Sequence, residues 1–334
     1  MPEQVRVPVL VTGGAGYIGS HAVLALLDGG WPVVVIDDLS TGFDWAVPEG
    51  AVFARGDIAD QALVERLIAE HRVAAIMHFA GSIIVPESVE NPLKYYLNNT
   101  VKSRALIESA VKGGVRHFIF SSTAATYGIP AEVPLREEAP TEPINPYGWS
   151  KLMTERMLRD AAAAHPLNFC ALRYFNVAGA DPAGRSGQST AGATHLIKVA
   201  VEAATGKRGH VAVYGSDYDT PDGTGVRDYI HVSDLAAAHV FALERLIAAP
   251  DESHILNCGY GRGFSVLEVL DAVDRVTNAA VERRLAPRRA GDPPTLVADN
   301  RRILATLPWR PQRDDLATIV ADALAWERKL AERG

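Results

Sequence analysis

Cysteine is nearly absent from this sequence. Its 334 residues include only Cys170 and Cys258, which lie too far apart in the chain for the short spacings of metal-binding motifs. We therefore expect no metal site. Apolar stretches approaching the length of about 20 residues that a membrane helix needs are also lacking. The first residues, Met1 to Gln4, carry neither a basic nor a long apolar region, and we expect a cytoplasmic protein without a membrane partner.

Basic residues are also fewer than acidic residues in this sequence. The chain has 33 Lys and Arg against 40 Asp and Glu, a net charge of -7, which disfavours nucleic acid and acidic membranes as partners. Basic residues that bind a phosphorylated ligand must then be few and locally placed. Apolar residues make up 48% and charged residues 22%, an ordinary globular composition. At this length a single hydrophobic core stops growing, so we expect two lobes.

A glycine-rich turn follows the first apolar run, Val9 to Thr12. Gly13 and Gly16 allow a tight turn and close approach of the backbone to a pyrophosphate, and Gly19 allows the next helix to pack on its strand. The positive end of that helix faces the anion, so no lysine is needed. The pattern predicts a nucleotide-binding strand, turn and helix.

An acidic residue follows at the distance that this turn requires. Val33 to Ile36 reads as a second strand, and Asp37 comes directly after it. A carboxylate in that place binds both ribose hydroxyls of NAD and repels the additional phosphate of NADP, for which no nearby arginine is available. The sequence therefore predicts NAD as the cofactor.

Strands and helices alternate through the first half of the chain. Alternation of this kind indicates parallel strands with crossover helices, here an α/β fold with one doubly wound (Rossmann) sheet of six strands. The further strands are expected at Ala74 to Phe79, Phe118 to Ser121 and Phe169 to Tyr174. The helices are expected at about Gly16 to Asp28, Gln61 to His71, Pro92 to Lys112 and Tyr147 to Ala164.

The chain changes character after Asn176. A stretch rich in Gly, Ser and Thr precedes further helices, predicted at about His195 to Thr205, Asp234 to Leu246, Val266 to Val276 and Asp314 to Arg333. We expect a nucleotide-binding domain over residues 1–177 and a smaller, C-terminal substrate-binding lobe over 178–334. Residues 228–259, with a strand at His254 to Cys258, are expected to return to the first domain.

Three side chains with catalytic potential follow the nucleotide motif. Tyr147 and Lys151 stand four residues apart at the start of a predicted helix, so both project from one face. A phenol needs its pKa of about 10 lowered to act as a base near neutral pH, and a nearby cation has that effect. Thr123 ends the fourth strand at its carboxyl end, where ligands of such sheets bind. We expect its hydroxyl to share a substrate proton with Tyr147.

Taken together, these motifs resemble the extended short-chain dehydrogenase/reductase family. The stretch from Tyr214 to Val232 resembles its UDP-hexose 4-epimerase branch, as do Arg173 to Asn176 and Ala286 to Asp292. The resemblance covers nearly the whole chain. It implies interconversion of UDP-sugars that differ at C4 by transient oxidation with tightly bound NAD, in galactose metabolism or in supplying UDP-galactose for polysaccharides.

The resemblance also implies a role for individual residues. Residues implied to hold NAD, besides Gly13, Gly16 and Gly19, are Tyr17, Ile18, Asp37, Asp57, Ile58, Phe79, Ala80, Gly81, Asn99, Tyr147, Lys151 and Phe175. Residues implied to bind the UDP-sugar are Thr123, Tyr147, Asn176, His195, Leu196, Tyr214, Arg227, Arg289, Asp292 and Leu296. Phe79 and Phe175 could instead be core residues, Asp57 a helix cap, Arg227 the partner of Asp228, and Arg288 a solvated neighbour of Arg289.

The chain departs from the family pattern in four places. Thr123 stands where serine is common, which keeps the hydroxyl, and Ser82-Ile83-Ile84 replaces a segment that often carries a lysine. His195 stands where asparagine is frequent, and Leu296 stands where relatives have tyrosine or a smaller residue. These departures concern binding and specificity more than the chemistry.

Other members of the family remain alternatives. A UDP-pentose or UDP-N-acetylhexosamine 4-epimerase would share all these motifs. A 4,6-dehydratase would carry an Asp-Glu pair where this chain has Ala124-Ala125, and a catalytically silent scaffold would be expected to lose Tyr147 or Lys151. The family also implies a homodimer, in which the helices near 92–112 and 147–164 of two copies form a four-helix bundle. Leu152, Met153, Met157 and Leu158 could face either that bundle or the sheet.

Overall fold

The computed structural model describes residues 6–289 and 292–333. Met1 to Gln4, and Ala290 and Gly291 within the stretch that resembles the epimerase branch, lie outside the described residues. The chain divides into two compact units. Unit 1 comprises residues 1–126, 145–173 and 236–256, and unit 2 comprises 127–144, 174–235 and 257–334. Residues 127–144 thus belong with unit 2, whereas the sequence placed them in the first domain.

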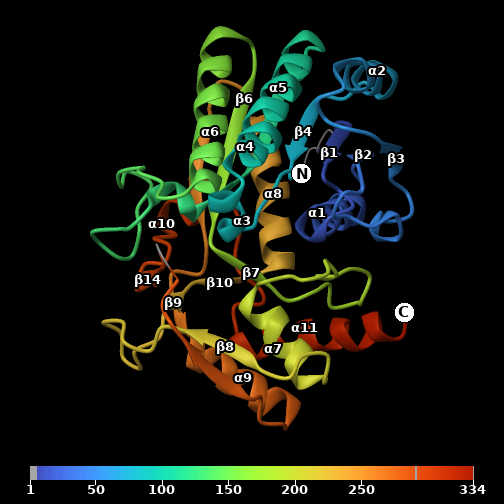
Figure 1. Cartoon of the computed structure of the whole chain (residues 1–334). Helices are drawn as coiled ribbons and strands as arrows, with labels where there is room; N and C mark the ends of the chain where they lie inside the picture. Colours follow the sequence, from blue (N-terminus) through green and yellow to red (C-terminus); the bar gives the residue numbers. More distant parts are fainter. Residues whose placement is uncertain (1–5, 290–291, 334) are drawn as a thin grey trace. The chain divides into compact units, whose positions relative to one another are not determined.

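The core of unit 1 is a sheet of seven strands in the order β11-β6-β5-β4-β1-β2-β3 (Figure 1). Pairing is parallel from β3 through β2, β1 and β4 to β5. The buried strands are near-continuous apolar runs, as expected where both faces of a parallel sheet are covered. The bounds are β1 Val9–Thr12, β2 Val33–Asp37, β3 Val52–Arg55, β4 Ala75–His78, β5 His117–Thr123, β6 Asn168–Tyr174 and β11 His254–Cys258.

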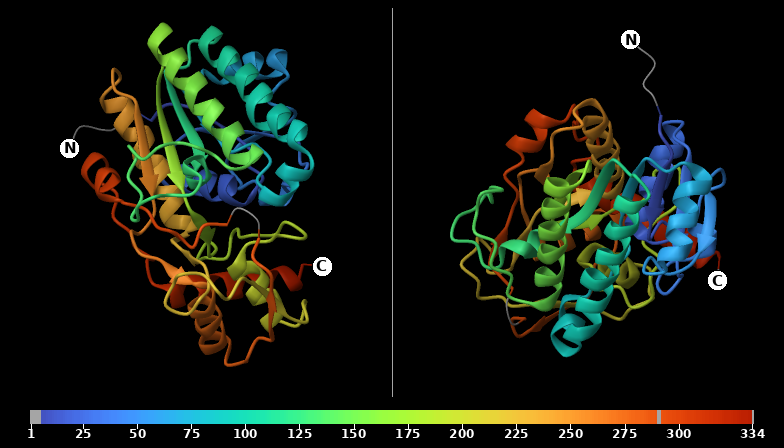
Figure 2. Two further views of the ribbon diagram at one scale, coloured as in Figure 1. Left: turned by 60° about the vertical axis from the view of Figure 1, so that its left-hand side comes forward. Right: turned by 90° about the horizontal axis from the view of Figure 1, so that it is seen from above.

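Helices cover both faces of this sheet. Helices α2, α5 and α6 lie side by side on one face, and residues 236–248 of α8 lie on the other (Figure 2). The long α6 begins where the Asn145 side chain accepts a hydrogen bond from the Gly148 amide. The bounds are α1 Tyr17–Asp28, η1 Asp44–Ala46, α2 Gln61–His71, α3 Val85–Glu90, α4 Pro92–Tyr95, η2 Tyr96–Val101, α5 Lys102–Lys112, η3 Ala124–Tyr127, α6 Pro146–Ala164 and α8 Val232–Ala248.

Two sequence predictions for unit 1 need correction. The sheet has seven strands rather than six, because Val52–Arg55 (β3) adds an edge strand whose Val52 and Phe53 are exposed and therefore give no buried apolar signal. The helix predicted over 92–112 runs without a gap from Pro92 to Lys112, but the sequence did not predict that its turn η2 is π-helical. Asn99 in that turn binds Ser82 and Ser150, and π-helical turns are frequent at functional sites.

Unit 2 has small sheets and a helical core. Strands β7 and β10 pair in parallel, β8 pairs with β13, and β9 lies between β12 and β14. Helices α7, α9 and α11 pack against one another around Val201, Val269 and Ile319. The bounds are β7 Asn176–Ala178, α7 Leu196–Ala204, β8 Val211–Tyr214, β9 Val226–Arg227, β10 Tyr229–His231, β12 Phe264–Ser265, α9 Val266–Thr277, β13 Arg283–Ala286, β14 Thr295–Leu296, α10 Arg301–Thr306 and α11 Leu316–Ala331.

No helix in the described part of the chain is both long enough and apolar enough to cross a membrane.

Candidate active site

The glycine turn between β1 and α1 lets neighbouring backbone segments approach each other closely. Gly13 has a φ of +70°, and a Cβ there would stand 2.6 Å from the Ala80 backbone nitrogen. A Cβ on Gly19 would stand 2.1 Å from the carbonyl oxygen of Gly13. Any side chain at either position would therefore displace backbone. Helix α1 begins at Tyr17 directly after this turn, and the N-terminus of a helix that follows a glycine turn is the arrangement that a pyrophosphate requires. These residues fit the nucleotide of the cofactor that the sequence predicted.

Asp37 lies at the end of β2, beside this turn. One carboxylate oxygen accepts a hydrogen bond from the Ala15 amide at 3.0 Å, and the other accepts from the Leu39 amide at 2.8 Å. Burial raises the pKa of Asp37, and the two amides oppose that rise. The overlooked strand β3 places Arg55 opposite Asp37 in the pairing register. An arginine is thus near in the fold although none is near in the sequence.

Asp57 and Asn99 have protein partners that the sequence did not reveal. Burial alone would raise the pKa of Asp57, but its 2.6 Å ion pair with Lys102 and a hydrogen bond from the Ala59 amide bring it below the usual value. The α2 cap is Asp60 rather than Asp57. The side chain of Asn99 binds the Ser82 amide and carbonyl at 2.7 and 2.9 Å. It therefore fixes the loop that follows Gly81.

The remaining predicted cofactor residues lie at the ends of the strands or on nearby segments. Ile58 is buried in the core of unit 1, while the ring of Phe79 lies 4.8 Å from that of His239. Gly81 lies next to Asn99, because a Cβ on this glycine would meet the Asn99 oxygen at 2.8 Å. Tyr17 is in the first turn of α1, and burial raises the pKa of its phenol. Phe175 belongs to unit 2 and is half-buried.

The three predicted catalytic residues come together in unit 1. Thr123 is the last residue of β5, Tyr147 lies in the first turn of α6, and both side chains are buried. Burial raises the pKa of Tyr147, and the hydrogen bond from Thr123 lowers it. Lys151, one turn along α6, donates to the carbonyl of Ser121 at 3.0 Å and lies 5.0 Å from the centre of the Phe120 ring. Burial lowers the pKa of Lys151 to about 8, so it is still mostly protonated at neutral pH.

The predicted substrate residues of unit 2 form two groups. In the first, the guanidinium carbon of Arg289 lies 3.9 Å from the centre of the Tyr214 ring. In the second, β9 pairs with β14 so that Arg227 lies opposite Leu296, and a guanidinium nitrogen of Arg227 is 3.8 Å from an Asp292 oxygen. Arginine forks of this kind match phosphate oxygens.

Three other residues that the sequence predicted to bind the substrate lie at the ends of elements in unit 2. Asn176 begins β7, and its amide donates to the Asp228 carbonyl at 3.0 Å. His195 caps the start of α7, just before Leu196, and burial lowers its pKa. A neutral imidazole there keeps one nitrogen as a hydrogen-bond donor and one as an acceptor.

Two of the simpler alternatives are wrong in the structure. Arg227 is not the partner of Asp228, because the Asp228 carboxylate instead accepts hydrogen bonds from the amides of Tyr260 and Gly261, each at 3.0 Å. Arg288 is not merely solvated, because its guanidinium binds Asp217 at 2.7 Å and stacks over the Tyr218 ring at 4.2 Å. Burial raises the pKa of Asp228 to about 6. No local sequence signal predicted that its carboxylate would bind the backbone amides of residues 260 and 261.

Within the described residues, no three His, Cys, Asp or Glu side chains are grouped so that they could hold a metal ion.

A glycine turn, an acidic strand end and a Thr/Tyr/Lys set on one Rossmann sheet define a dinucleotide-dependent enzyme that oxidises and reduces an alcohol carbon. Residues 9–259 match the model of the NAD dependent epimerase/dehydratase family, and the chain belongs to that family. It is 58% identical over 324 residues to the UDP-glucose 4-epimerase of Azospirillum brasilense, covering 97% of this chain and 93% of that relative.

Solved structures give the same result. The UDP-glucose 4-epimerase from Brucella ovis in complex with NAD superposes with a TM-score of 0.93 at 45% identity, covering 96% of this chain and 98% of that one. The UDP-Glc/GlcNAc 4-epimerase from Campylobacter jejuni superposes with a TM-score of 0.85 at 47% identity, covering 97% and 99%. The fold class predicted from the sequence, the family and its NAD dependence are therefore confirmed.

Proposed function

We propose that this chain interconverts UDP-glucose and UDP-galactose. The observation that carries the proposal is the burial of Thr123, Tyr147 and Lys151 together where β5 ends and α6 begins, with Lys151 bound to the carbonyl of Ser121. The names of the relatives, read together with this geometry, supply the substrate.

The residues of the chain divide the chemistry between them. Tyr147 takes the proton of the sugar's 4-hydroxyl and later returns it, while Thr123 holds that proton in line by sharing a hydrogen bond. The charge of Lys151 favours the phenolate form of Tyr147. Bound NAD would supply a reversible hydride acceptor for C4, so that the 4-keto sugar could be reduced again on its other face. The glycine turn and Asp37 bind its nucleotide end.

The proposal also assigns a binding function to each of the two domains. Residues 1–177 would bind NAD, and residues 178–334 would bind the UDP-sugar, except that 228–259 would return to the first domain. The arginines Arg227 and Arg289 support it, because both belong to unit 2 and both suit a diphosphate. We also place the enzyme in the cytoplasm, in keeping with a sequence that has only two cysteines.

The experiment is a coupled assay for UDP-glucose formed from UDP-galactose, without added NAD. Because hydride returns in every turnover, a bound cofactor gains nothing by dissociating, and the purified protein should release about one NAD per chain when denatured. Activity without added NAD is the expected result. Activity that depends on free NAD, or none with UDP-galactose, would contradict the proposal.

One observation favours a second substrate, UDP-N-acetylglucosamine. Leu296, which the family resemblance places at the sugar's C2 substituent, lacks the ring and hydroxyl of tyrosine, and it is only half-buried on β14. A smaller side chain at this position leaves room for an N-acetyl group. One apolar contact, however, changes the discrimination between two substrates by only about 1 to 3 kcal/mol. The name of the Campylobacter jejuni neighbour includes this sugar for that protein.

A substrate panel tests the role of Leu296. We expect slower but measurable epimerisation of UDP-N-acetylglucosamine, and its reduction in Leu296→Tyr while UDP-galactose turnover is retained. UDP-xylose in the same panel tests the pentose alternative. If the wild-type protein converts UDP-galactose but not UDP-N-acetylglucosamine, the small side chain of Leu296 does not set the substrate specificity.

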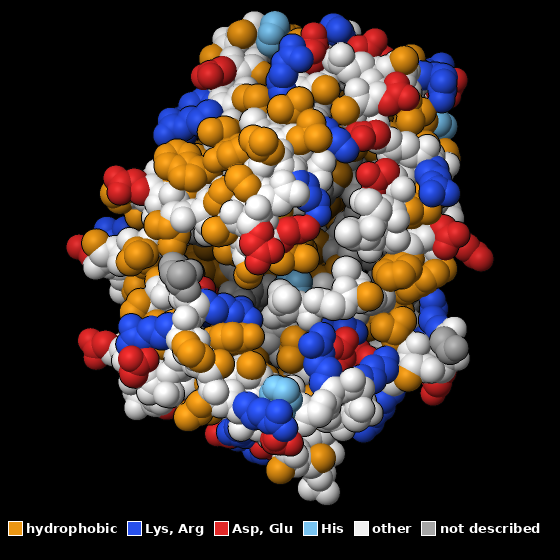
Figure 3. Space-filling model, in the orientation of Figure 1, with side chains coloured by type: hydrophobic (Ala, Val, Ile, Leu, Met, Phe, Trp, Pro, Cys, Tyr) orange, Lys and Arg blue, Asp and Glu red, His pale blue; other side chains and the backbone are white. Residues whose placement is uncertain are grey.

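We further propose that two copies form a homodimer through a four-helix bundle. Leu93, Leu97 and Val101 follow one another at four-residue intervals along α4 and η2, and their exposed fractions are 77%, 50% and 54%. Trp149 and Met153 continue this exposed surface on α6, and we call the five residues the apolar face. Hydrophobic side chains gather over α4, α5 and α6 in the space-filling view (Figure 3). An apolar patch this continuous is typical of an interface.

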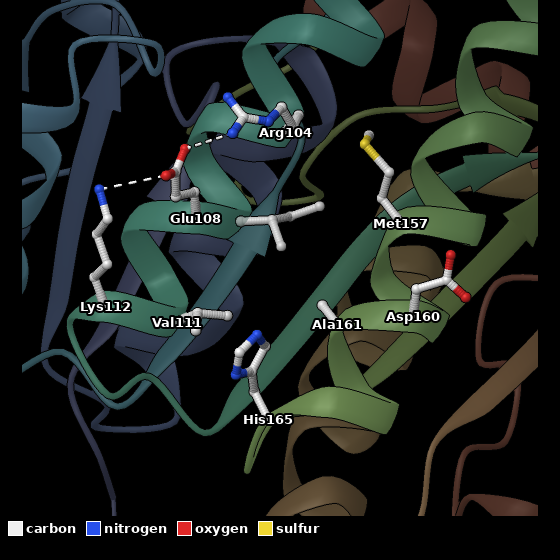
Figure 4. Close-up of a pocket in the computed structure, with 9 residues that line it drawn as sticks. Arg104, Glu108, Val111, Lys112, Met157, Asp160, Ala161 and His165 are labelled. Atoms are coloured by element: carbon white, nitrogen blue, oxygen red, sulfur yellow. Dashed lines mark ion pairs between the residues drawn. The ribbon is translucent and has the colours of Figure 1, made fainter.

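A groove of about 370 Å³ lies between α5 and α6, next to this face. Met157 and Ala161 of α6 line it, one and two further turns beyond Met153, and Val111 of α5 lines it as well (Figure 4). Glu108 binds Arg104 and Lys112 at its edge, which leaves a polar rim beside an apolar floor. That pattern is usual for protein interfaces. Of the four residues left undecided by the sequence, Leu152 and Leu158 are buried in unit 1, and Met153 is exposed.

A further inference from the structure

A buried ion pair lies under the catalytic helix. Arg173, near the end of β6, donates from Nε to one oxygen of Glu155 at 2.9 Å and from Nη2 to the other at 2.6 Å. The Ser122 hydroxyl donates to Glu155 at 2.5 Å. The side chains of Arg173 and Glu155 are only 4% and 2% exposed, and Ser122 is fully buried. None of the three has a role in the proposed reaction.

Glu155 shares the buried face of α6 with the catalytic residues, one turn beyond Lys151 and two turns beyond Tyr147. Two α6 side chains bind successive residues at the end of β5. Lys151 binds the carbonyl of Ser121, and Glu155 binds the hydroxyl of Ser122, directly before Thr123. The helix is thus held against this strand end at two levels, next to the catalytic pair.

We propose that Glu155, held by Arg173 and Ser122, is a positioning residue that sets the distance between the Tyr147 phenol and the Thr123 hydroxyl. The inference rests on the proposed function, because that hydrogen bond matters only if Tyr147 moves the substrate proton. Strands β5 and β6 are neighbours in the sheet, so the carboxylate fastens α6 to both at once. Ser122 directly precedes Thr123, and a shift at Glu155 is transmitted to the catalytic pair over one residue of strand.

The chemistry of the carboxylate explains why an acid stands here. Glu155 accepts three hydrogen bonds, two of them from one guanidinium, which gives a rigid planar geometry. A glutamine has a single acceptor oxygen and leaves the arginine charge uncompensated in a buried place. Catalytic groups lose up to about a hundredfold in rate when misplaced by 1 Å, so a small displacement of α6 would be measurable.

The first test is Ser122→Ala, which removes one neutral hydrogen bond from Glu155 and leaves the ion pair. We expect kcat per bound NAD to fall by about threefold to tenfold with KM within about twofold of the wild type. The hydrogen bond from Thr123 lowers the pKa of Tyr147, so its weakening should raise that pKa. The pKa is read from phenolate absorbance, as the difference between each protein and the same protein carrying Tyr147→Phe.

The second test is Glu155→Gln, compared with the double variant Glu155→Gln with Arg173→Gln. The single variant leaves a buried cation and should lower kcat per bound NAD more than Ser122→Ala does. The double variant restores neutrality and should recover part of that loss. The control is Glu327→Gln, which breaks a buried ion pair of the same kind with Lys198 in unit 2. It should lower stability without changing kcat per bound NAD.

The absorbance titration needs no sugar, so it tests Glu155 separately from the epimerase activity. A raised pKa of Tyr147 in Ser122→Ala supports the positioning role even if UDP-galactose proves not to be the substrate. An unchanged pKa of Tyr147 overturns the proposal. The proposal is also overturned if the activity of Ser122→Ala and of Glu155→Gln falls only in proportion to the amount of folded, NAD-bound protein.

Discussion

At the scale of single residues, Tyr147 is held between two opposing effects on its pKa. Burial raises the pKa of the phenol, and the Thr123 hydroxyl lowers it. An ionised share near neutral pH needs further help, which the protonated amine of Lys151 and the positive ring of bound NAD can give. The site therefore works only when strand end, helix face and cofactor are all in place.

Tyr147→Phe tests this residue directly. The variant should lose about 10² to 10⁴ in kcat, because a general base is removed, while the phenyl ring keeps the packing. Bound NAD and the melting temperature should be retained. Tyr96→Phe, the same change on the half-buried η2 of the same unit, is the matched control and should keep full activity. A Tyr147→Phe protein within tenfold of the wild type would show that another group is the base.

Lys151→Met should change the dependence of the rate on pH. Loss of a nearby cation raises the pKa of Tyr147, so the acidic limb of the kcat/KM profile should move to higher pH. Lys151 itself has a pKa of about 8, so it is mainly neutral in the wild type well above that pH. The difference between the two proteins should accordingly be largest below pH 8 and shrink above it. A constant ratio at all pH values would show that the charge of Lys151 does not tune the base.

At the scale of elements, helix starts are fixed by local hydrogen bonds. Ser265 begins α9 with a complete capping box: its hydroxyl accepts from the Glu268 amide at 3.0 Å, and its own amide donates to the Glu268 carboxylate at 2.7 Å. The Ser265 hydroxyl also donates to Asp222. A helix with these bonds starts at one residue rather than fraying.

Ser265→Ala should therefore destabilise unit 2 without affecting the chemistry. The loss of an N-cap costs about 1 kcal/mol, which corresponds to a melting temperature lower by about 1 to 2 °C in a chain of this size. Thermal denaturation measures the effect, and kcat should stay unchanged. Glu268→Gln keeps an acceptor for the capping box and is the control. Equal melting temperatures for Ser265→Ala and the wild type would show that the box adds nothing to stability.

At the scale of the whole molecule, the apolar face of unit 1 presents five hydrophobic side chains that are each at least 40% exposed. Its residues repeat at intervals of four along α4, η2 and α6, so they form rows rather than scattered single contacts. In a two-fold dimer the same rows meet their own copies, which suits an apolar surface because it needs no charge complement.

Leu97→Asp should convert the dimer into a monomer. A carboxylate in the middle of the apolar face would lose its hydration on association without gaining a partner. Light scattering at micromolar concentration measures the mass, and bound NAD reports that unit 1 is intact. Leu285→Asp changes a leucine that is also exposed, on β13 of unit 2, and should remain dimeric. A monomeric wild-type protein would disprove the dimer.

The sequence by itself determined those features that depend on neighbours along the chain. The glycine turn, Asp37 after β2, and the pair Tyr147 and Lys151 were all visible as short spacings. The helix Gln61–His71 was predicted with the bounds that the structure has, because its apolar period and its cap are both local. The doubly wound class followed from the alternation of strands and helices.

Only the tertiary structure decided which distant residues meet. Strand β3 is an exposed edge strand with no buried pattern, so the sequence missed it and with it the position of Arg55 opposite Asp37. The π-helical turn η2 contains Asn99, which binds Ser82, 17 residues earlier in the chain. The carboxylate of Glu155 on α6 meets Arg173 on β6. These contacts are made by long-range packing, and no periodicity within a single segment encodes them.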